Sequence, residues 1–180
     1  MKNITPSIAT YSGKNINLDN LTTECIDLVD IAKGLSNVCR FGGQCEEFYS
    51  VAQHSILVSL LVPLPYALEG LLHDAAEAFI GDMPSPFKKN LTDYMEMENK
   101  IESVIKRFFS LPPIKSPEVK SADLIALATE CRDLNFPRAL SYPPLRGIAP
   151  SDKHLVTPWP PKRAFQEFIA RYDSITQSSV

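Results

Sequence analysis

The 180-residue chain has the composition of a globular protein, with 44% apolar and 22% charged residues. This is enough to build a substantial core, and we expect one domain over residues 1–180. A formal net charge of -3 provides no general surface for a nucleic-acid polymer, so any phosphate contact should come from a few local cations. The four cysteines lack a paired C-x2-C spacing, which argues against a structural zinc ribbon.

No membrane-spanning or secretory segment is visible. The chain does not start with a basic and then apolar signal, and its longest apolar run, Ile56 to Leu64, is interrupted by Ser59 and Pro63. That run is too short to cross a bilayer. We therefore expect a cytoplasmic protein without a membrane partner, and we expect it to form a homo-oligomer, a dimer or higher.

The first elements are short. Ser7 to Leu18 contains two extended pieces around the turn residues Ser12 to Asn15, which indicates a small N-terminal β-hairpin. Asp27 to Val38 has helical spacing of its apolar residues and predicts a first helix. Gly42 and Gly43 should stop the chain from continuing as a helix.

A second helix should begin at Ser50, because Ser50 and Gln53 have the spacing of a capping box. It carries His54 in its first turn and ends near Pro63. The third helix, predicted over Tyr66 to Ile80, has one apolar face, made of Leu68, Leu71, Leu72, Ala75, Ala76 and Phe79.

The opposite face of this third helix carries His73, Asp74 and Glu77. Most polar helix faces simply meet water, but Gly70 on the same side costs about 1 kcal/mol relative to alanine and indicates a close approach. The segment from Phe48 to Ala76 holds only two charged residues, so it has the character of protein interior. A buried carboxylate there must be paired, hydrogen-bonded or bound to metal.

The rest of the chain predicts three further helices and two irregular segments. The prolines of Gly81 to Pro86 indicate a stiff loop, followed by a helix over Leu91 to Phe109 and another over Pro117 to Leu134. Residues 135–161 should form an irregular loop, and a last helix should run from Pro161 to Tyr172. The fold class is all-α, a single helical bundle with a possible N-terminal hairpin.

Three of these helices carry groups that can bind metal: His54, then His73 and Asp74, then Asp123. Each alone has a common structural explanation, since a lone histidine is often a hydrogen-bonded core residue and Asp123 could be an early-turn helix acid. Together, imidazole nitrogens and carboxylate oxygens suit Mn, Fe, Co, Ni or Zn. Such a site supports metal-assisted hydrolysis of phosphoesters.

The order His, His-Asp, Asp on successive helices resembles the HD-domain phosphohydrolase superfamily. The resemblance runs through VAQHS (Val51 to Ser55), LLHDAAEAFIGD (Leu71 to Asp82) and KSADLIALATE (Lys120 to Glu130), and covers about residues 30–134. Within that superfamily, the chain looks most like short bacterial 5'-deoxynucleotidases of the YfbR type and small phage deoxynucleotide triphosphohydrolases.

The resemblance implies a role for each matching position. His54, His73, Asp74 and Asp123 would hold a divalent metal ion (Co, Mn, Zn, Fe or Mg). Glu77 and Asp82 would orient the attacking water or protonate the leaving oxygen, and Arg40 would bind the substrate phosphate. The compared nucleotidases have tryptophan beside that arginine, where this chain has Phe41, the candidate for the nucleoside contact.

Structural explanations stay open for several candidates. Arg40 could be a cation at a helix C-terminus, and Asp82 could form an Asx turn with the following Met83-Pro84 segment. Lys88 and Lys89 follow the proline loop, where solvent-facing lysines are common, and Lys88 is the candidate for a phosphate contact.

The expected function is hydrolysis of a deoxynucleoside monophosphate to a deoxynucleoside and phosphate. One alternative is a deoxynucleoside triphosphate triphosphohydrolase such as a dATPase, and another is a nucleotide-binding sensor without turnover. A cyclic-nucleotide or alarmone hydrolase is a lesser alternative, because one fold supports several phosphoester chemistries.

Overall fold

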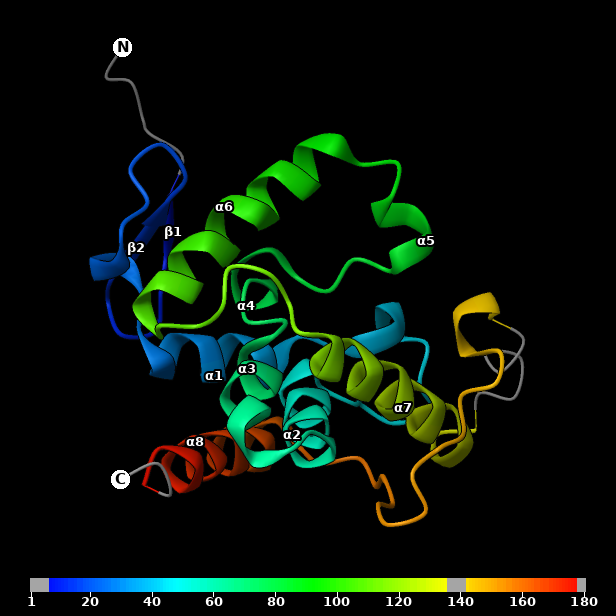
Figure 1. Cartoon of the computed structure of the whole chain (residues 1–180). Helices are drawn as coiled ribbons and strands as arrows, with labels where there is room; N and C mark the ends of the chain where they lie inside the picture. The colour runs from blue at the N-terminus through cyan, green and yellow to red at the C-terminus, as the bar shows by residue number, and fades with distance from the viewer. Residues whose placement is uncertain (1–6, 136–141, 178–180) are drawn as a thin grey trace.

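The computed structural model describes residues 7–135 and 142–177, and its helices pack around α2 (Val51–Leu61) (Figure 1). This helix is apolar on nearly all sides, which is typical of a helix in the middle of a bundle. Every residue from Val51 to Ser59 is buried. The helices that contact it are α1 (Leu28–Asn37), α3 (Ala67–Leu72), α7 (Pro117–Asp133) and α8 (Pro161–Gln177).

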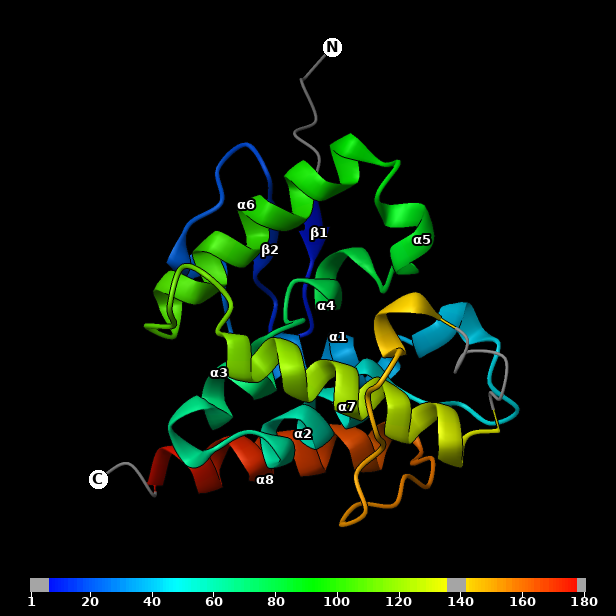
Figure 2. The same ribbon diagram turned by 45° about the vertical axis from the view of Figure 1, so that its right-hand side comes forward.

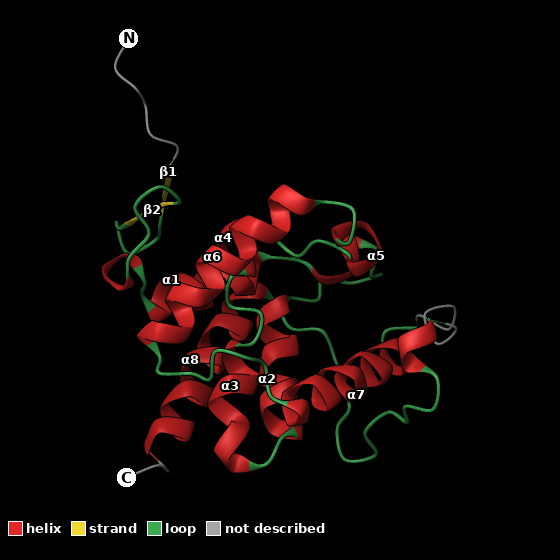
Figure 3. Cartoon of the chain, turned by 45° about the horizontal axis from the view of Figure 1, so that its top comes forward, coloured by secondary structure: helices red, strands yellow, loops and turns green. Residues whose placement is uncertain are grey.

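The all-α prediction is confirmed, and the small hairpin is present (Figure 3). Strands β1 (Ser7–Ala9) and β2 (Asn15–Asn17) pair antiparallel. Ser12, in the turn between them, donates from its backbone N and its Oγ to the two carboxylate oxygens of Asp30, at 2.6 and 2.7 Å. The hairpin is therefore attached to α1.

Side chains cap the starts of α1 and α2, and the cap at Ser50 is the predicted one. Asp27 accepts the backbone N–H of Val29 at 3.0 Å at the start of α1, and Ser50 Oγ accepts the backbone N–H of Gln53 at 3.2 Å at the start of α2. The second half of the capping box does not form. The Gln53 side chain instead donates to the Thr157 carbonyl at 2.8 Å and accepts from the Trp159 backbone at 2.9 Å, which joins the segment before α8 to α2.

The single helix predicted over Tyr66 to Ile80 is wrong, because it is interrupted after His73. The structure has α3 and then α4 (Glu77–Ile80), joined by turns with tighter hydrogen bonds such as Glu77 N to Asp74 O at 3.0 Å. In a continuous α-helix the Gly70 carbonyl would accept from the Asp74 backbone. Here it accepts from His73 Nδ1 at 2.8 Å. The His73-Asp74 pair thus lies on a tightened turn.

Two glycines allow the helices around this turn to approach closely. A Cβ on Gly70 would lie 3.2 Å from the Ser59 Cα, so the close approach expected at Gly70 is made by α2. A Cβ on Gly34 would lie 2.5 Å from the Ala78 carbonyl oxygen. The contact between α1 and α4 therefore requires glycine at position 34.

The second half of the chain also agrees with the predicted helices. A short α5 (Ser85–Lys88) includes the last residues of the predicted proline loop, and α6 (Thr92–Phe108) follows. Helix α8 continues beyond the predicted end at Tyr172. Of the predicted irregular segment, residues 136–141 lie outside the described residues, and the turn Pro143–Leu145 lies on the same side of the molecule as α5 (Figure 2).

The hydrophobic core contains residues from Ile16 in the hairpin to Ile175 in α8. Elements near both ends of the described chain therefore pack on the same center. Among the described helices, none combines the length and the apolar character needed to cross a membrane.

Candidate metal centre

Two imidazole rings face each other where α2 meets the turn after α3. His54 Nε2 and His73 Nε2 are 3.3 Å apart. Both rings are buried, and both come from segments whose backbone is fixed by close packing, α2 at the center of the bundle and the turn beside Gly70.

The other ring nitrogen of each histidine determines which tautomer is present. His73 Nδ1 donates to the Gly70 carbonyl at 2.8 Å, because a carbonyl oxygen can only accept. His54 Nδ1 lies 2.6 Å from Glu130 Oε1, a carboxylate oxygen, and donates to it. When both rings are neutral, both Nε2 atoms therefore carry lone pairs that face each other. A cation satisfies this arrangement, and the residues fit a divalent metal.

Two aspartates complete the donor set. Asp74 Oδ2 lies 2.9 Å from His73 Nε2 and 3.6 Å from His54 Nε2. Asp123 Oδ1, on α7, lies 3.2 Å from His54 Nε2 and 3.9 Å from His73 Nε2. One ligand atom each from His54, His73 and Asp123 lie within 4.8 Å of one another. The four predicted ligands are thus brought together by α2, the α3–α4 turn and α7.

The electrostatics of the metal-free site favour ionised carboxylates. Burial disfavours the charge on Asp74, but His73 and Lys115 outweigh it and hold its pKa well below the usual range. Burial likewise opposes ionisation of Asp123, and the hydrogen bond and charge of the two histidines lower its pKa. Two negative ligands are therefore present at neutral pH.

The pKa of His54 shifts upward, in the direction opposite to the shifts of Asp74 and Asp123. Burial and the nearby Arg40 oppose its positive charge, but Glu130 and Asp123 outweigh them and raise the pKa of His54 to about 9. Without a metal, the ring is therefore protonated at neutral pH, and Nε2–H can donate to Asp123. A metal must displace this proton to bind.

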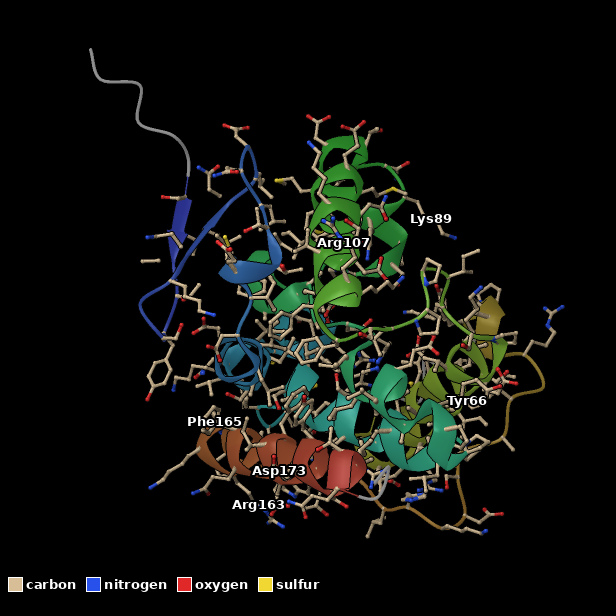
Figure 4. The ribbon with its side chains drawn as sticks, turned by 60° about the vertical axis from the view of Figure 1, so that its left-hand side comes forward. Tyr66, Lys89, Arg107, Arg163, Phe165 and Asp173 are labelled. Carbon is tan, nitrogen blue, oxygen red and sulfur yellow. The ribbon has the colours of Figure 1, made fainter. Side chains whose placement is uncertain are left out.

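Asp74 and Asp123, the two candidate metal-binding aspartates, line a cavity of about 710 Å³. This volume is within the range of small-molecule sites, which is about 300–1,000 Å³. The cavity is lined by all of the predicted site residues except His54 and His73, namely Arg40, Phe41, Asp74, Glu77, Asp82, Lys88 and Asp123. Lys89, in contrast, is exposed and extends away from the helices (Figure 4).

Two further acids stand beside the metal ligands. Burial, with the nearby charges of Asp74 and Asp82, raises the pKa of Glu77 well above its usual range. Its Oε2 atom is buried and has no hydrogen-bond partner among the described residues. Burial also raises the pKa of Asp82. Both carboxyl groups therefore keep a proton to higher pH than an exposed acid, which suits proton transfer.

Arg40 and Phe41 form the edge of the cavity in an unusual backbone turn. Phe41 has φ 57° and ψ 27°, and Gly42 follows with φ 60°. A left-handed conformation is uncommon for a bulky residue, and such conformations concentrate at functional sites. The Arg40 guanidinium lies 5.1 Å from the centroid of the Phe41 ring. Arg40 NH2 donates to Glu130 Oε2 at 3.0 Å, while its buried Nε has no partner in the described chain.

Glu130 is a member of the site that the motifs alone did not identify. It is fully buried and accepts from three donors, on Arg40, Tyr49 and His54. Its position carries a signal, because it lies two helical turns after Asp123 in α7 and is flanked by apolar and small residues. A lone acid on the buried side of a helix requires partners.

Lys115 is a second unpredicted member. Its Nζ lies 3.7 Å from Asp74 Oδ1, and it lines the main cavity. Glu69 on α3 fixes the neighbouring residue by accepting from the Ser116 backbone at 2.6 Å and from Ser116 Oγ at 2.5 Å. No periodicity marks Lys115, because it lies in the irregular segment before α7.

Comparisons with known proteins give relatives but no activity. No family model matches the chain. It is 45% identical over 170 residues to the uncharacterized protein YfdR of Escherichia coli, covering 94% of this chain and 96% of that protein. It is 34% identical over 138 residues to an uncharacterized protein of Rhodobacter capsulatus, covering 68% of this chain and 70% of the relative.

Proposed function

The chain belongs to the family of the Escherichia coli protein YfdR, and we propose that it is a divalent-metal-dependent phosphohydrolase acting on deoxynucleotides. The observation that carries this proposal is the pair of facing Nε2 atoms, 3.3 Å apart, whose Nδ1 atoms are both committed to acceptors. The order of the ligands along the chain, which resembles the HD-domain phosphohydrolases, supports the same chemistry.

His54, His73, Asp74 and Asp123 would hold the metal, with Co, Mn, Zn, Fe and Mg as candidates. A divalent ion in such a site lowers the pKa of bound water and draws charge from phosphate oxygens. The donor set of two imidazoles and two carboxylates suits transition metals better than Mg, which prefers oxygen ligands.

The remaining residues of the cavity would bind the substrate and move protons. Arg40 Nε is a buried donor without a partner among the described residues, and a phosphate oxygen would satisfy it. Glu77, whose pKa is raised by burial and by its acidic neighbours, can donate a proton to the leaving oxygen. Phe41 and Tyr142, both lining the cavity, offer ring faces for a base.

The first candidate reaction is that of a 5'-deoxynucleotidase, which releases phosphate from a deoxynucleoside monophosphate. The preference for deoxyribose rests on the resemblance to the short deoxynucleotidases. The cavity of about 710 Å³ has room for a nucleotide, with Asp74 and Arg40 toward the phosphate and the rings toward the base.

A second candidate is a deoxynucleoside triphosphate triphosphohydrolase, and a second cavity favours it. This cavity of about 320 Å³ shares Asp74, Lys88 and Lys115 with the main one. Two more lysines, Lys106 and Lys120, line it. Acids offset part of this charge, since Lys88 is paired with Glu98, and Glu102 is 2.8 Å from Lys106. The lysines could hold the outer phosphates of a triphosphate.

Separation of products distinguishes these candidates. Metal-stripped full-length protein is reconstituted with Mg, Mn, Co or Zn and given each deoxynucleoside mono- and triphosphate and the matching ribonucleotides. Metal-dependent release of phosphate from a monophosphate supports the nucleotidase, and release of intact triphosphate supports the alternative. Binding of nucleotide without any product would indicate a sensor and contradict the proposed hydrolase.

A matched pair of lysine variants sharpens the choice between the two substrates. Lys88 lines both cavities, whereas its neighbour Lys89 is exposed (Figure 4). If the substrate is a triphosphate, Lys88→Ala should raise KM for it more than Lys89→Ala does. Equal effects of the two substitutions would remove Lys88 from the substrate site.

A further inference from the structure

A single buried carboxylate joins the metal ligands to the candidate phosphate-binding arginine. Glu130 Oε1 accepts from His54 Nδ1 at 2.6 Å and from Tyr49 OH at 2.9 Å. Glu130 Oε2 accepts from Arg40 NH2 at 3.0 Å. The Glu130 side chain is 0% exposed to solvent, so it can affect the site only through these hydrogen-bond partners.

The contact with His54 determines which nitrogen is available to the metal. While Oε1 accepts the Nδ1–H, a neutral His54 ring must present its bare Nε2, the nitrogen that lies 3.3 Å from His73 Nε2 and 3.2 Å from Asp123 Oδ1. In the other tautomer, Nε2–H would point at these ligands and exclude a metal. A carboxylate behind a histidine ligand fixes the ring in this way in many metal sites.

The contact with Arg40 determines how the guanidinium is presented. One terminal nitrogen is occupied by Glu130, while Nε is buried and has no partner among the described residues. The same ion pair keeps the positive charge of Arg40 in a buried position beside the cavity, where an unpaired cation would be costly.

We infer that Glu130 is a positioning residue that sets both the metal-binding nitrogen of His54 and the phosphate-binding orientation of Arg40. The half of this inference that concerns Arg40 rests on the proposed function, whereas the half that concerns His54 requires only that the site binds metal. Glu130 contacts neither the metal nor the substrate and acts through these two residues.

The substitution Glu130→Gln distinguishes the positioning role of Glu130 from a role in packing alone, because the two side chains have nearly the same shape. Glutamine has one acceptor oxygen and one NH2 group, so it cannot accept from both His54 and Arg40. If its oxygen faces His54, its NH2 opposes the Arg40 guanidinium. If its oxygen faces Arg40, its NH2 donates to His54 Nδ1 and switches the ring to the tautomer that excludes the metal.

The experiment compares the wild-type protein with Glu130→Gln and with Tyr49→Phe as the matched control. Tyr49→Phe removes one hydrogen bond to the same carboxylate but leaves its contacts to His54 and Arg40. Three quantities are measured on the full chain: zinc affinity by competition with a chelator, the Nδ1–H resonance of His54 in the zinc-bound protein, and the affinity of that protein for inorganic phosphate. Zinc affinity is compared at pH 9, so that the proton on His54 in the wild-type protein masks little of the effect.

We expect Glu130→Gln to lower zinc affinity by about 10- to 100-fold, or, if the amide favours His54, to lower phosphate affinity instead. Tyr49→Phe should reduce thermal stability and leave zinc and phosphate affinities near those of the wild-type protein. A folded Glu130→Gln variant with wild-type zinc affinity, phosphate affinity and His54 resonance would overturn the inference.

The wild-type protein provides a test that does not depend on the variant folding. Its zinc-bound form should show a His54 Nδ1–H resonance that exchanges slowly with solvent, with zinc on Nε2. Zinc on Nδ1 would overturn the inference even if Glu130→Gln does not fold. If these results are as expected but no nucleotide is hydrolysed, the proposed function fails and the positioning of His54 by Glu130 stands.

Discussion

Zinc binding should weaken by about 50-fold when the pH is lowered from 9 to 7. The reason is the proton on His54 in the metal-free protein. Burial and Arg40 oppose this proton, but Glu130 Oε1 at 2.6 Å and Asp123 Oδ1 at 3.2 Å outweigh them and raise the pKa of His54 to about 9. The metal needs the bare Nε2 atom, so it must displace one proton from this ring.

The size of the effect follows from the raised pKa. At pH 9 about half of the His54 rings are unprotonated, and well below that pH the unprotonated fraction falls tenfold per pH unit, which is about 1.4 kcal/mol of apparent binding free energy per unit. Zinc affinity therefore rises with pH and becomes constant above the pKa of His54. Asp74 and Asp123, whose pKa values are lowered by the histidines against the effect of burial, stay ionised throughout this range and contribute no proton.

Calorimetry in two buffers with different heats of ionisation measures the protons released on zinc binding. We expect about one proton from His54 at pH 7 and a declining number above pH 9. Glu77→Gln serves as the control, because Glu77, whose pKa is raised by burial and by its acidic neighbours, lies beside the site and could also release a proton. A zinc affinity that is the same at pH 7 and pH 9, without proton release, would refute the assignment of His54 as a ligand.

Three further substitutions test other parts of the site. Glu77→Gln should reduce turnover by about 100-fold or more while metal content is retained, and near-wild-type turnover across the pH range would remove Glu77 from the mechanism. Arg40→Lys can keep an ion pair with Glu130 but loses the unpartnered Nε, so kcat/KM should fall by about 10- to 100-fold for nucleotides and little for a small artificial phosphoester; an equal loss on both would exclude the phosphate contact. Gly34→Ala would place a Cβ 2.5 Å from the Ala78 carbonyl oxygen, so it should destabilise the protein by about 1–3 kcal/mol in denaturant unfolding, and unchanged stability would contradict the close packing of α1 on α4.

Local patterns predicted most of the fold. The hairpin, the cap at Ser50, and the long helices α6 and α7 follow from turn residues, a capping residue and helical spacing. The motifs also indicated that the four candidate metal ligands lie near one another, and they do, because α2, α3 and α7 contact one another.

The break between α3 and α4 could not be predicted in the same way. The apolar periodicity continues through His73. Only the tertiary structure shows that the Gly70 carbonyl accepts from His73 Nδ1 instead of from a backbone N–H of the helix. Glu130 was missed for a related reason, since its partners lie up to 90 residues away in the sequence. Pairing over such distances leaves no periodic signal in a single sequence.

The most direct test of the account is the metal content and hydrolytic activity of His73→Ala beside His154→Ala. His73 faces the other ligands, whereas His154 lies in the segment before α8 and bonds to Ser151. We predict that metal-free His73→Ala is as stably folded as the metal-free wild-type protein but loses metal-dependent hydrolysis, while His154→Ala keeps both metal and activity. Full activity in His73→Ala, or unfolding of its metal-free form while the metal-free wild-type protein stays folded, would contradict the assignment of the metal centre.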